Sequence, residues 1–259
     1  MKNYGTVSRP LVMGVLNVTP DSFSDGGRWL DPEAAIAHGL ALAAEGADVV
    51  DVGGESTRPG AAEVPAEEEG RRVVPVIAAL ASQVRVSVDT RKAEVADAAL
   101  AAGATIVDDV SASLYEVAAA HGAGWVAMHM RGTPATMQQQ ASYDDVVAEV
   151  RAFLVDRAEK AVAAGVGEVW IDPGLGFAKT ADHNLSLLRH LDDLVATGHP
   201  VLVGASRKSF IGRLTGDAPV DDRLEASLAL AVWAMEKGAA MVRVHDVRAT
   251  VQAARLVAA

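Results

Sequence analysis

Hydrophobic and polar positions follow one repeating order along the chain, in which short β-branched apolar runs alternate with longer Ala-rich stretches. The runs are continuously apolar, as expected for strands that are covered on both faces. The stretches between them have a helical pattern. We therefore expect strands at Leu11–Asn17, Ala47–Val52, Arg85–Asp89, Thr105–Asp109, Gly124–Met130, Glu168–Asp172, Pro200–Ala205 and Met241–His245. We expect helices over roughly 32–46, 66–82, 91–102, 113–121, 142–165, 181–197, 221–238 and 247–258.

Eight β–α units are the number that closes a (β/α)8 TIM barrel, and this α/β fold is our prediction. Glycines follow several helical stretches, which is a usual helix-stop signal. A doubly wound open sheet is the rival architecture, but the first strand leads into NVTPDSFSDGG, which contains no G-x-G-x-x-G turn. No linker or composition break interrupts the chain, so we expect one domain over residues 1–259.

Composition narrows the classes of function. The 259 residues are 50% hydrophobic and only 4% aromatic, which suits a large aliphatic core of strands and helices. The absence of cysteine excludes disulfides, thiolate catalysis and zinc–thiolate sites. A net charge of −11 argues against nucleic-acid and membrane-surface partners. The chain shows no signal peptide or transmembrane run, so we expect a cytoplasmic protein.

Polar residues gather at the carboxyl ends of the predicted strands, where barrels of this type place their active sites. The loop Gly204–Ser209 combines small residues, hydroxyls and the positive charge of Lys208, which suits an anion. Arg243 and His245 on the neighbouring strand favour the same interpretation, since Arg can bind phosphate oxygens with two hydrogen bonds. A solvated basic loop is the alternative.

Carboxylates form a second polar group at these strand ends. A buried carboxylate is costly unless it is paired or hydrogen-bonded, so each could simply be paired inside the barrel, as with Asp51 capping a turn. As a set, they favour a pocket for a heterocycle rich in N–H donors. The set comprises Asp51, Asp89, Asp108, Asp109 and Asp172.

Two connections are long for βα loops, Val18–Gly27 and Gly53–Ala62, and loops of this kind often close over a substrate. Asn17, at the end of the first strand, offers one oxygen ligand, which suits a diphosphate-bound Mg²⁺ that keeps most of its waters. The residues alone therefore predict a barrel enzyme with an anion site beside a polar heterocycle pocket.

Seven segments, in order, resemble the dihydropteroate synthase family of pterin-binding enzymes. They run from MGVLNVTPDSFSDGG through DVGGESTRPGA, VSVDTRK, MHMRGTPATMQ, IDPGLGFAKTADHN and GASRKSFIG to VRVHDV, and the wording of GLGFAKT and HDVRATV is closest to the actinobacterial branch. The resemblance implies condensation of (7,8-dihydropterin-6-yl)methyl diphosphate with p-aminobenzoate, by Mg²⁺-assisted loss of diphosphate and attack of the arylamine on a pterin methylene cation. It also implies a homodimer and inhibition by sulfonamides.

The resemblance also implies roles for individual residues. The pterin would meet Asp89, Asp108, Asp172 and Lys208, and the diphosphate would meet Thr57, Arg58, Arg243 and His245. Met128 and Gly204 would also bind substrate. The p-aminobenzoate would meet Phe177, Lys208, Ser209, Pro59 and Phe23, and the metal would meet Asn17. Asp89, Lys208, Arg243 and His245 would act in catalysis.

One position departs from the family pattern. The fourth strand usually carries Asn-Asp, whereas this chain has Asp108-Asp109. An amide both donates and accepts, but an ionised carboxylate only accepts, so Asp108 would have to be protonated, rotate away or use a water molecule. Two alternatives remain: a non-catalytic pterin-binding paralogue, and a methyltetrahydrofolate:corrinoid methyltransferase-like barrel. The latter would not need the STRPG loop, the SRKS loop or the RVHD strand.

Overall fold

Eight parallel strands form the centre of the protein in a computed structural model, which describes residues 9–19, 32–58 and 60–259. The strands are β1 (Leu11–Asn17), β2 (Val49–Gly53), β3 (Arg85–Asp89), β4 (Ile106–Asp109), β5 (Gly124–Met128), β6 (Val169–Asp172), β7 (Leu202–Val203) and β8 (Met241–Val244). Each lies within or beside a run that the sequence predicts. β7 is shorter than expected, because only two residues of the run 200–205 pair as a strand.

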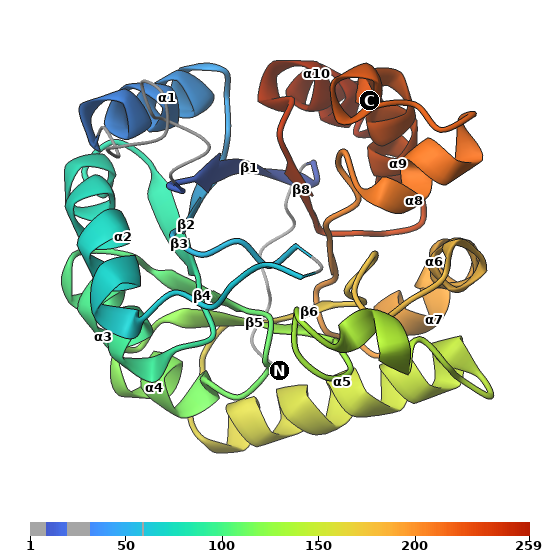
Figure 1. The fold of residues 1–259 in the computed structure, drawn as a ribbon, viewed down its shortest axis with the longest axis horizontal. Coiled ribbons are helices and arrows are strands. Elements are labelled where there is room, and N and C mark those ends of the chain that lie inside the picture. Colours follow the sequence, from blue (N-terminus) through green and yellow to red (C-terminus); the bar gives the residue numbers. More distant parts are fainter. Residues whose placement is uncertain (1–8, 20–31, 59) are drawn as a thin grey trace.

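The strands pair in the order β6-β5-β4-β3-β2-β1-β8-β7. A parallel bridge between Ile171 and Val201 joins the two ends of this sheet, and Ile171 N–H donates to Pro200 O at 3.0 Å. The sheet is therefore a nearly closed barrel, and Figure 1 shows the helices as an outer ring around it. The predicted (β/α)8 TIM barrel is confirmed.

The helices follow the strands much as the sequence predicts. They are α1 (Pro32–Ala44), α2 (Ala66–Leu80), α3 (Ala93–Ala101), α4 (Tyr115–Ala120), α5 (Val146–Ala163), α6 (Ala181–Arg189), α7 (Leu191–Val195), α8 (Ser209–Leu214), α9 (Leu224–Glu236) and α10 (Val247–Val257). The stretch 181–197 is two helices, because the backbone leaves helical geometry at His190. Short 3₁₀ turns occupy Met137–Gln140 and Val220–Asp222.

Two apolar layers hold the barrel together. The larger lies between the outer faces of the strands and the helices, and it includes Trp125, Leu154 and Ile77. The smaller fills the barrel itself, and its members come from seven strands: Met13, Val49, Ile106, Val126, Trp170, Leu202 and Met241. The barrel is thus plugged with side chains below the level at which the polar residues begin.

Strand alternation explains the polar layer above this plug. Side chains two residues apart on a strand point to the same face. Val49 lies in the plug and is followed by Asp51, Ile106 by Asp108, and Trp170 by Asp172. Met241 is followed in the same way by Arg243 and His245. Two residues along each of these four strands, the barrel interior therefore changes from apolar to charged.

None of the helices in the described ranges has the length and hydropathy that a membrane crossing needs.

Candidate active site

Arg243 occupies the middle of the polar layer. Its Nε donates to Asp51 Oδ2 at 2.7 Å, and its Nη2 donates to Asp89 Oδ2 at 2.7 Å. Its Nε also lies 3.3 Å from Asp108 Oδ2. The guanidinium of Arg243, on β8, thus contacts carboxylates on β2, β3 and β4 and extends across the barrel interior. This contact corrects the idea that Asp51 caps a turn, because Asp51 lies within β2 and pairs with Arg243.

The carboxylates of this layer cannot all be ionised without cost. Burial raises the pKa of Asp89 to about 7, against the favourable charge of Arg243. Burial, and next the charge of Asp51, raise the pKa of Asp108 well above its usual range. One oxygen of Asp51 and one of Asp89 are buried without a hydrogen-bond partner. This layer therefore offers unpaired acceptors to a donor-rich ligand.

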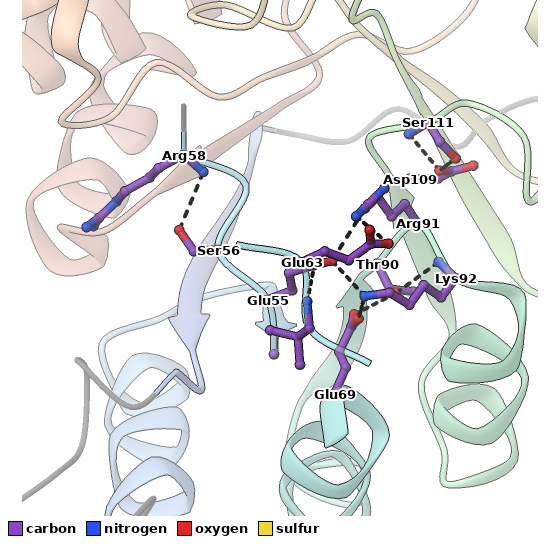
Figure 2. A network of polar contacts seen from close by, with 12 residues as sticks. Glu55, Ser56, Arg58, Glu63, Glu69, Thr90, Arg91, Lys92, Asp109 and Ser111 are labelled. Atoms are coloured by element: carbon purple, nitrogen blue, oxygen red, sulfur yellow. Dashed lines mark hydrogen bonds and ion pairs between the residues drawn. The ribbon is translucent and has the colours of Figure 1, made fainter. Parts of the chain in front are cut away.

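Asp109 does not belong to this group, although the sequence placed it there. Its Oδ1 accepts from Ser111 N–H at 2.8 Å, which Figure 2 shows, and its Oδ2 accepts from Leu114 N–H at 2.7 Å and from Trp125 Nε1 at 3.2 Å. Asp109 follows Asp108 directly on β4, so the two side chains point to opposite faces. Asp109 is a structural residue of the turn after β4.

Asp172 completes the layer from β6. Burial raises its pKa, and the charge of Lys208 opposes that rise. Its Oδ1 accepts from Gly174 N–H at 2.7 Å. Only glycine fits at position 174, because φ is +65° and a Cβ would lie 2.0 Å from His129 O. Met128, the register partner of Asp172, is buried beside this turn.

The loop after β6 places an aromatic ring beside Lys208. The ammonium of Lys208 lies 4.5 Å from the centre of the Phe177 ring and also donates to Leu175 O. Burial lowers the pKa of Lys208 to about 8, against the nearby charge of Asp172. Gly204 lies beside both Arg243 and Asp172, because a Cβ at this position would be 3.7 Å from Arg243 Cβ and 3.8 Å from Asp172 Oδ2. These predicted residues therefore do come together at one end of the barrel.

The residues of the SRKS loop have separate partners. Ser206 Oγ lies 3.0 Å from His245 Nδ1 and accepts from His245 N–H at 3.2 Å. Arg207 Nε donates to Asp246 at 3.1 Å, so its charge is already neutralised. Burial, and next the charge of Arg243, lower the pKa of His245 to about 4, which leaves the imidazole neutral near pH 7. Ser209 is exposed at the start of α8.

The loop after β2 carries Thr57, which is half-buried, and Arg58, which is exposed and whose N–H donates to Ser56 Oγ at 3.4 Å (Figure 2). Gly60 N–H donates to Pro134 O at 3.3 Å, so this loop reaches the loop after β5. Arg58 lies close enough to His245 for its charge to contribute to the lowered pKa of that residue. Phe23 and Pro59 lie outside the described residues, as do residues 20–27 of the first long loop.

A metal would find few protein ligands here. Within the described ranges, no group of three or more His, Asp or Glu side chains is arranged to hold an ion. Asn17 is half-buried at the end of β1, where it pairs in register with Gly53. One neutral amide fits a Mg²⁺ that is held mainly by water and substrate phosphates, rather than a resident metal in a protein cage.

Comparison with known proteins shows which family the chain belongs to. A family model described as "Pterin binding enzyme" matches residues 13–245. The dihydropteroate synthase of Mycobacterium leprae is 53% identical, and the match covers 96% of this chain and 92% of that protein. The chain belongs to the dihydropteroate synthase family. It is therefore a transferase of folate biosynthesis, and the resemblance read from the sequence is confirmed.

Solved structures of dihydropteroate synthases have the same fold. The Xanthomonas albilineans enzyme with 4-aminobenzoic acid is 51% identical, with a TM-score of 0.89 and coverage of 96% of this chain and 92% of that chain. The Yersinia pestis enzyme in a sulfonamide drug complex is 46% identical, with a TM-score of 0.90 and coverage of 96% and 94%.

Three residues in this region of the dihydropteroate synthase barrel were given no individual role by the sequence analysis. Ser206 holds His245, Lys179 holds the loop after β6, and Lys92 binds two carboxylates beside the loop after β2. Opposite charges in neighbouring βα loops are the signal that could have identified the last of these.

Proposed function

We propose that the polar layer around Arg243 is where this chain condenses (7,8-dihydropterin-6-yl)methyl diphosphate with p-aminobenzoate to give 7,8-dihydropteroate and diphosphate. The observation that supports this most strongly is the arrangement of Asp89, Asp108 and Asp172 around the cations Arg243 and Lys208. Carboxyl groups suit the N–H donors of a pterin, and the cations suit its diphosphate. The two parts of one substrate would thus find matching partners a few ångströms apart.

The proposed diphosphate site lies on the β8 side of this layer. Arg243 holds the carboxylates through Nε and Nη2, so Nη1, which makes none of these contacts, would donate to a phosphate oxygen. Ser206 Oγ accepts from His245 N–H, and its own proton would donate to His245 Nδ1, which lies 3.0 Å away. His245 would then carry its proton on Nε2 and donate it to the leaving diphosphate. Thr57 and Arg58 would approach from the loop after β2.

The chemistry needs no protein nucleophile. The bond between the pterin methylene carbon and the diphosphate oxygen breaks, and its electron pair leaves with diphosphate. The amine of p-aminobenzoate then supplies the pair for the new C–N bond and loses a proton. A Mg²⁺ held by the phosphates, water and Asn17 would neutralise charge on the leaving group. Asp89, when ionised, would stabilise the methylene cation by its negative charge.

The proposed p-aminobenzoate site is formed by Phe177, Lys208 and Ser209, with contributions from Pro59 and Phe23. The contact between Lys208 and the Phe177 ring supports it, since a flat aromatic acid could stack there with a cation nearby. Sulfonamides would compete at the same place. We expect p-aminobenzoate to bind tightly only after the pterin diphosphate has bound.

One assay tests the reaction. Purified protein, both substrates and Mg²⁺ should give dihydropteroate and diphosphate in equal amounts, and chelation of Mg²⁺ should stop the reaction. Calorimetry tests the order, because p-aminobenzoate should release little heat unless diphosphate or the pterin diphosphate is present. Pterin binding without any product would instead favour a non-catalytic paralogue.

We also propose that the protein is one domain, works in the cytoplasm and forms a homodimer. Three exposed large hydrophobic side chains support an interface, because Leu214, Val220 and Leu224 fall within eleven residues of one another in sequence. Sedimentation analysis checks this. A Val220→Glu variant that sediments like the unaltered protein would exclude this segment from the interface.

A further inference from the structure

Four charged residues join the loop after β2 to the loop after β3. We call Glu55, Glu69, Arg91 and Lys92 the rim network, and Figure 2 shows them pointing toward one another. Lys92 Nζ donates to Glu55 Oε2 at 2.7 Å and to Glu69 Oε2 at 2.5 Å. Arg91 Nε donates to Glu55 Oε2 at 3.4 Å. None of the roles proposed above uses these side chains.

The centre of the rim network is buried. Glu69 lies on α2 with 0% of its side chain exposed, and Glu55 and Lys92 expose 7% and 13% of theirs. Glu69 Oε1 also accepts from Thr90 Oγ1 at 2.7 Å. Buried charges are stable only with good partners, so this geometry is strongly fixed. Burial would raise the pKa of Glu55, yet the hydrogen bonds from Lys92, Val64 N–H and Arg91 together lower it.

Glu55 also closes the base of the loop. Its Oε1 accepts from Val64 N–H at 2.8 Å, which ties the loop's beginning to its end. Arg91 makes a second tie, because its Nη2 lies 2.9 Å from Glu63 Oε1 while its Nε meets Glu55. The segment between these ties holds Thr57 and Arg58.

Beyond its base, this segment has lighter support. Arg58 N–H donates to Ser56 Oγ at 3.4 Å, and Gly60 N–H donates to Pro134 O at 3.3 Å. Both distances are long for N–H···O bonds. The position of Thr57 and Arg58 over the barrel therefore depends on how firmly the base is held.

We propose that Glu55, Lys92 and Glu69 are positioning residues that anchor the loop after β2, so that Thr57 and Arg58 face the diphosphate before the substrate arrives. This inference rests on the proposed diphosphate role of that loop. A loose loop would have to be ordered by the substrate, and that ordering cost weakens binding. The loss affects ground state and transition state alike, so KM rises while kcat stays nearly constant.

Glu55→Gln is the sharpest test. The Gln carbonyl can keep the bond from Val64 N–H, but its NH₂ group then faces Lys92 and Arg91. Glu67→Gln is the matched control, because it makes the same charge change at an exposed side chain in the first turn of α2, close in sequence to the loop. We expect amides of residues 56–63 to exchange hydrogen about tenfold faster in Glu55→Gln, and KM for the pterin diphosphate to rise about five- to tenfold with kcat within about twofold. The control should match the unaltered protein in both measurements.

Lys92→Met removes the same link from the β3 side and should speed exchange in the same residues. Exchange in β1–β4 checks that each variant is folded. Unchanged exchange in 56–63 for both Glu55→Gln and Lys92→Met would overturn the proposal, and so would faster exchange with an unchanged KM. Arg58→Ala distinguishes failure of the proposed diphosphate role from failure of the proposed anchoring. If that variant keeps its KM, the proposed diphosphate role of the loop fails, whereas the exchange rates report on the anchoring alone.

Discussion

Arg243 shows how one residue can serve both the fold and the chemistry. Its guanidinium contacts Asp51, Asp89 and Asp108, and these buried carboxylates raise its pKa further above its already high value, against the opposing effect of burial. The sequence predicts Arg243 as a phosphate ligand. The structure adds that Arg243 pairs with one carboxylate from each of three strands, β2, β3 and β4. A phosphate that binds Arg243 therefore meets a guanidinium whose orientation is already fixed, which lowers the cost of binding.

Replacing Arg243 by Ala should weaken both diphosphate binding and the fold. The change removes a charged partner of the diphosphate, at a cost of about 2–5 kcal/mol in binding free energy. It also leaves buried carboxylates unpaired, which should lower the free energy of unfolding by about 3–5 kcal/mol. Calorimetric titration with diphosphate and Mg²⁺, together with urea unfolding, checks both. Adding Asp51→Asn should restore part of the stability but none of the diphosphate affinity. Unchanged turnover and affinity in Arg243→Ala would reject this placement.

Asp108 should make stability depend on pH. Because its pKa is raised in the folded protein, it keeps a proton that the unfolded chain releases above about pH 4. The folded state then binds more protons than the unfolded state, so the free energy of unfolding falls as pH rises, until Asp108 ionises in the fold. Asp108→Asn removes this effect and should stabilise the protein by about 1–2 kcal/mol more near pH 8 than near pH 5. Urea unfolding at both pH values measures the difference.

The same substitution tests whether Asp108 meets the pterin. A protonated carboxyl can donate as an amide does, so pterin affinity should fall as pH rises and Asp108 loses its proton. In Asp108→Asn, KM for the pterin diphosphate should be lower and its pH dependence flatter, by about 1–2 kcal/mol at the high-pH end. Superimposable KM profiles for the two proteins would show that Asp108 has no such contact.

At the scale of elements, the loop after β6 is organised by one buried lysine. Lys179 Nζ lies 3.0 Å from His129 Nδ1, and it donates to Gly174 O at 3.1 Å and Phe177 O at 3.0 Å. Burial lowers its pKa to about 7, and burial, with the charge of Lys179 next, lowers that of His129 to about 3. Lys179 thereby shapes the loop that carries Phe177.

Lys179→Met should loosen this loop while leaving the barrel folded. Met has a similar length but no donor, so the buried acceptors lose their partner and the free energy of unfolding should fall by about 1–3 kcal/mol. Displacement of Phe177 should raise KM for p-aminobenzoate, with little change in diphosphate affinity. Thermal unfolding and steady-state kinetics give both results, with Lys160→Met on the exposed face of α5 as the control. Equal effects on both ligands would point to a general loss of structure instead.

For the whole molecule, the seam between β6 and β7 is where the barrel closes least firmly. β7 has two paired residues, and its link to β6 is a single bridge at Ile171 and Val201. By contrast, β1 pairs with β2 over five residues. Closure there depends on packing more than on strand hydrogen bonds.

This difference predicts an uneven pattern of hydrogen exchange. Amides of 201–203 and of Ile171 should exchange faster than those of β1–β3, because fewer ladder bonds must open to expose them. Native-state exchange measured by mass spectrometry at increasing denaturant tests this order. Equal protection of all eight strands would show that the barrel opens only as one cooperative unit.

The fold and much of the site could be predicted from the chain alone. Eight apolar runs separated by helical stretches specify a parallel barrel, because strands covered on both faces and helices with one apolar face have few other ways to bury their surface. The barrel in turn places Asp89, Asp172 and His245 at one end, since all parallel strands end there. Seven segments at the ends of these runs and in the loops that follow also indicated the family.

Only the tertiary structure decided which polar residues face one another. Asp108 and Asp109 are adjacent in sequence and chemically alike, yet strand alternation directs one to Arg243 and the other to the turn at Ser111. The ion pairs of Arg243 with Asp51 and Asp89 join residues 192 and 154 positions apart. Sequence periodicity reports which face of its own element a side chain occupies, whereas such partners depend on the stagger and closure of the whole barrel, which no local pattern contains.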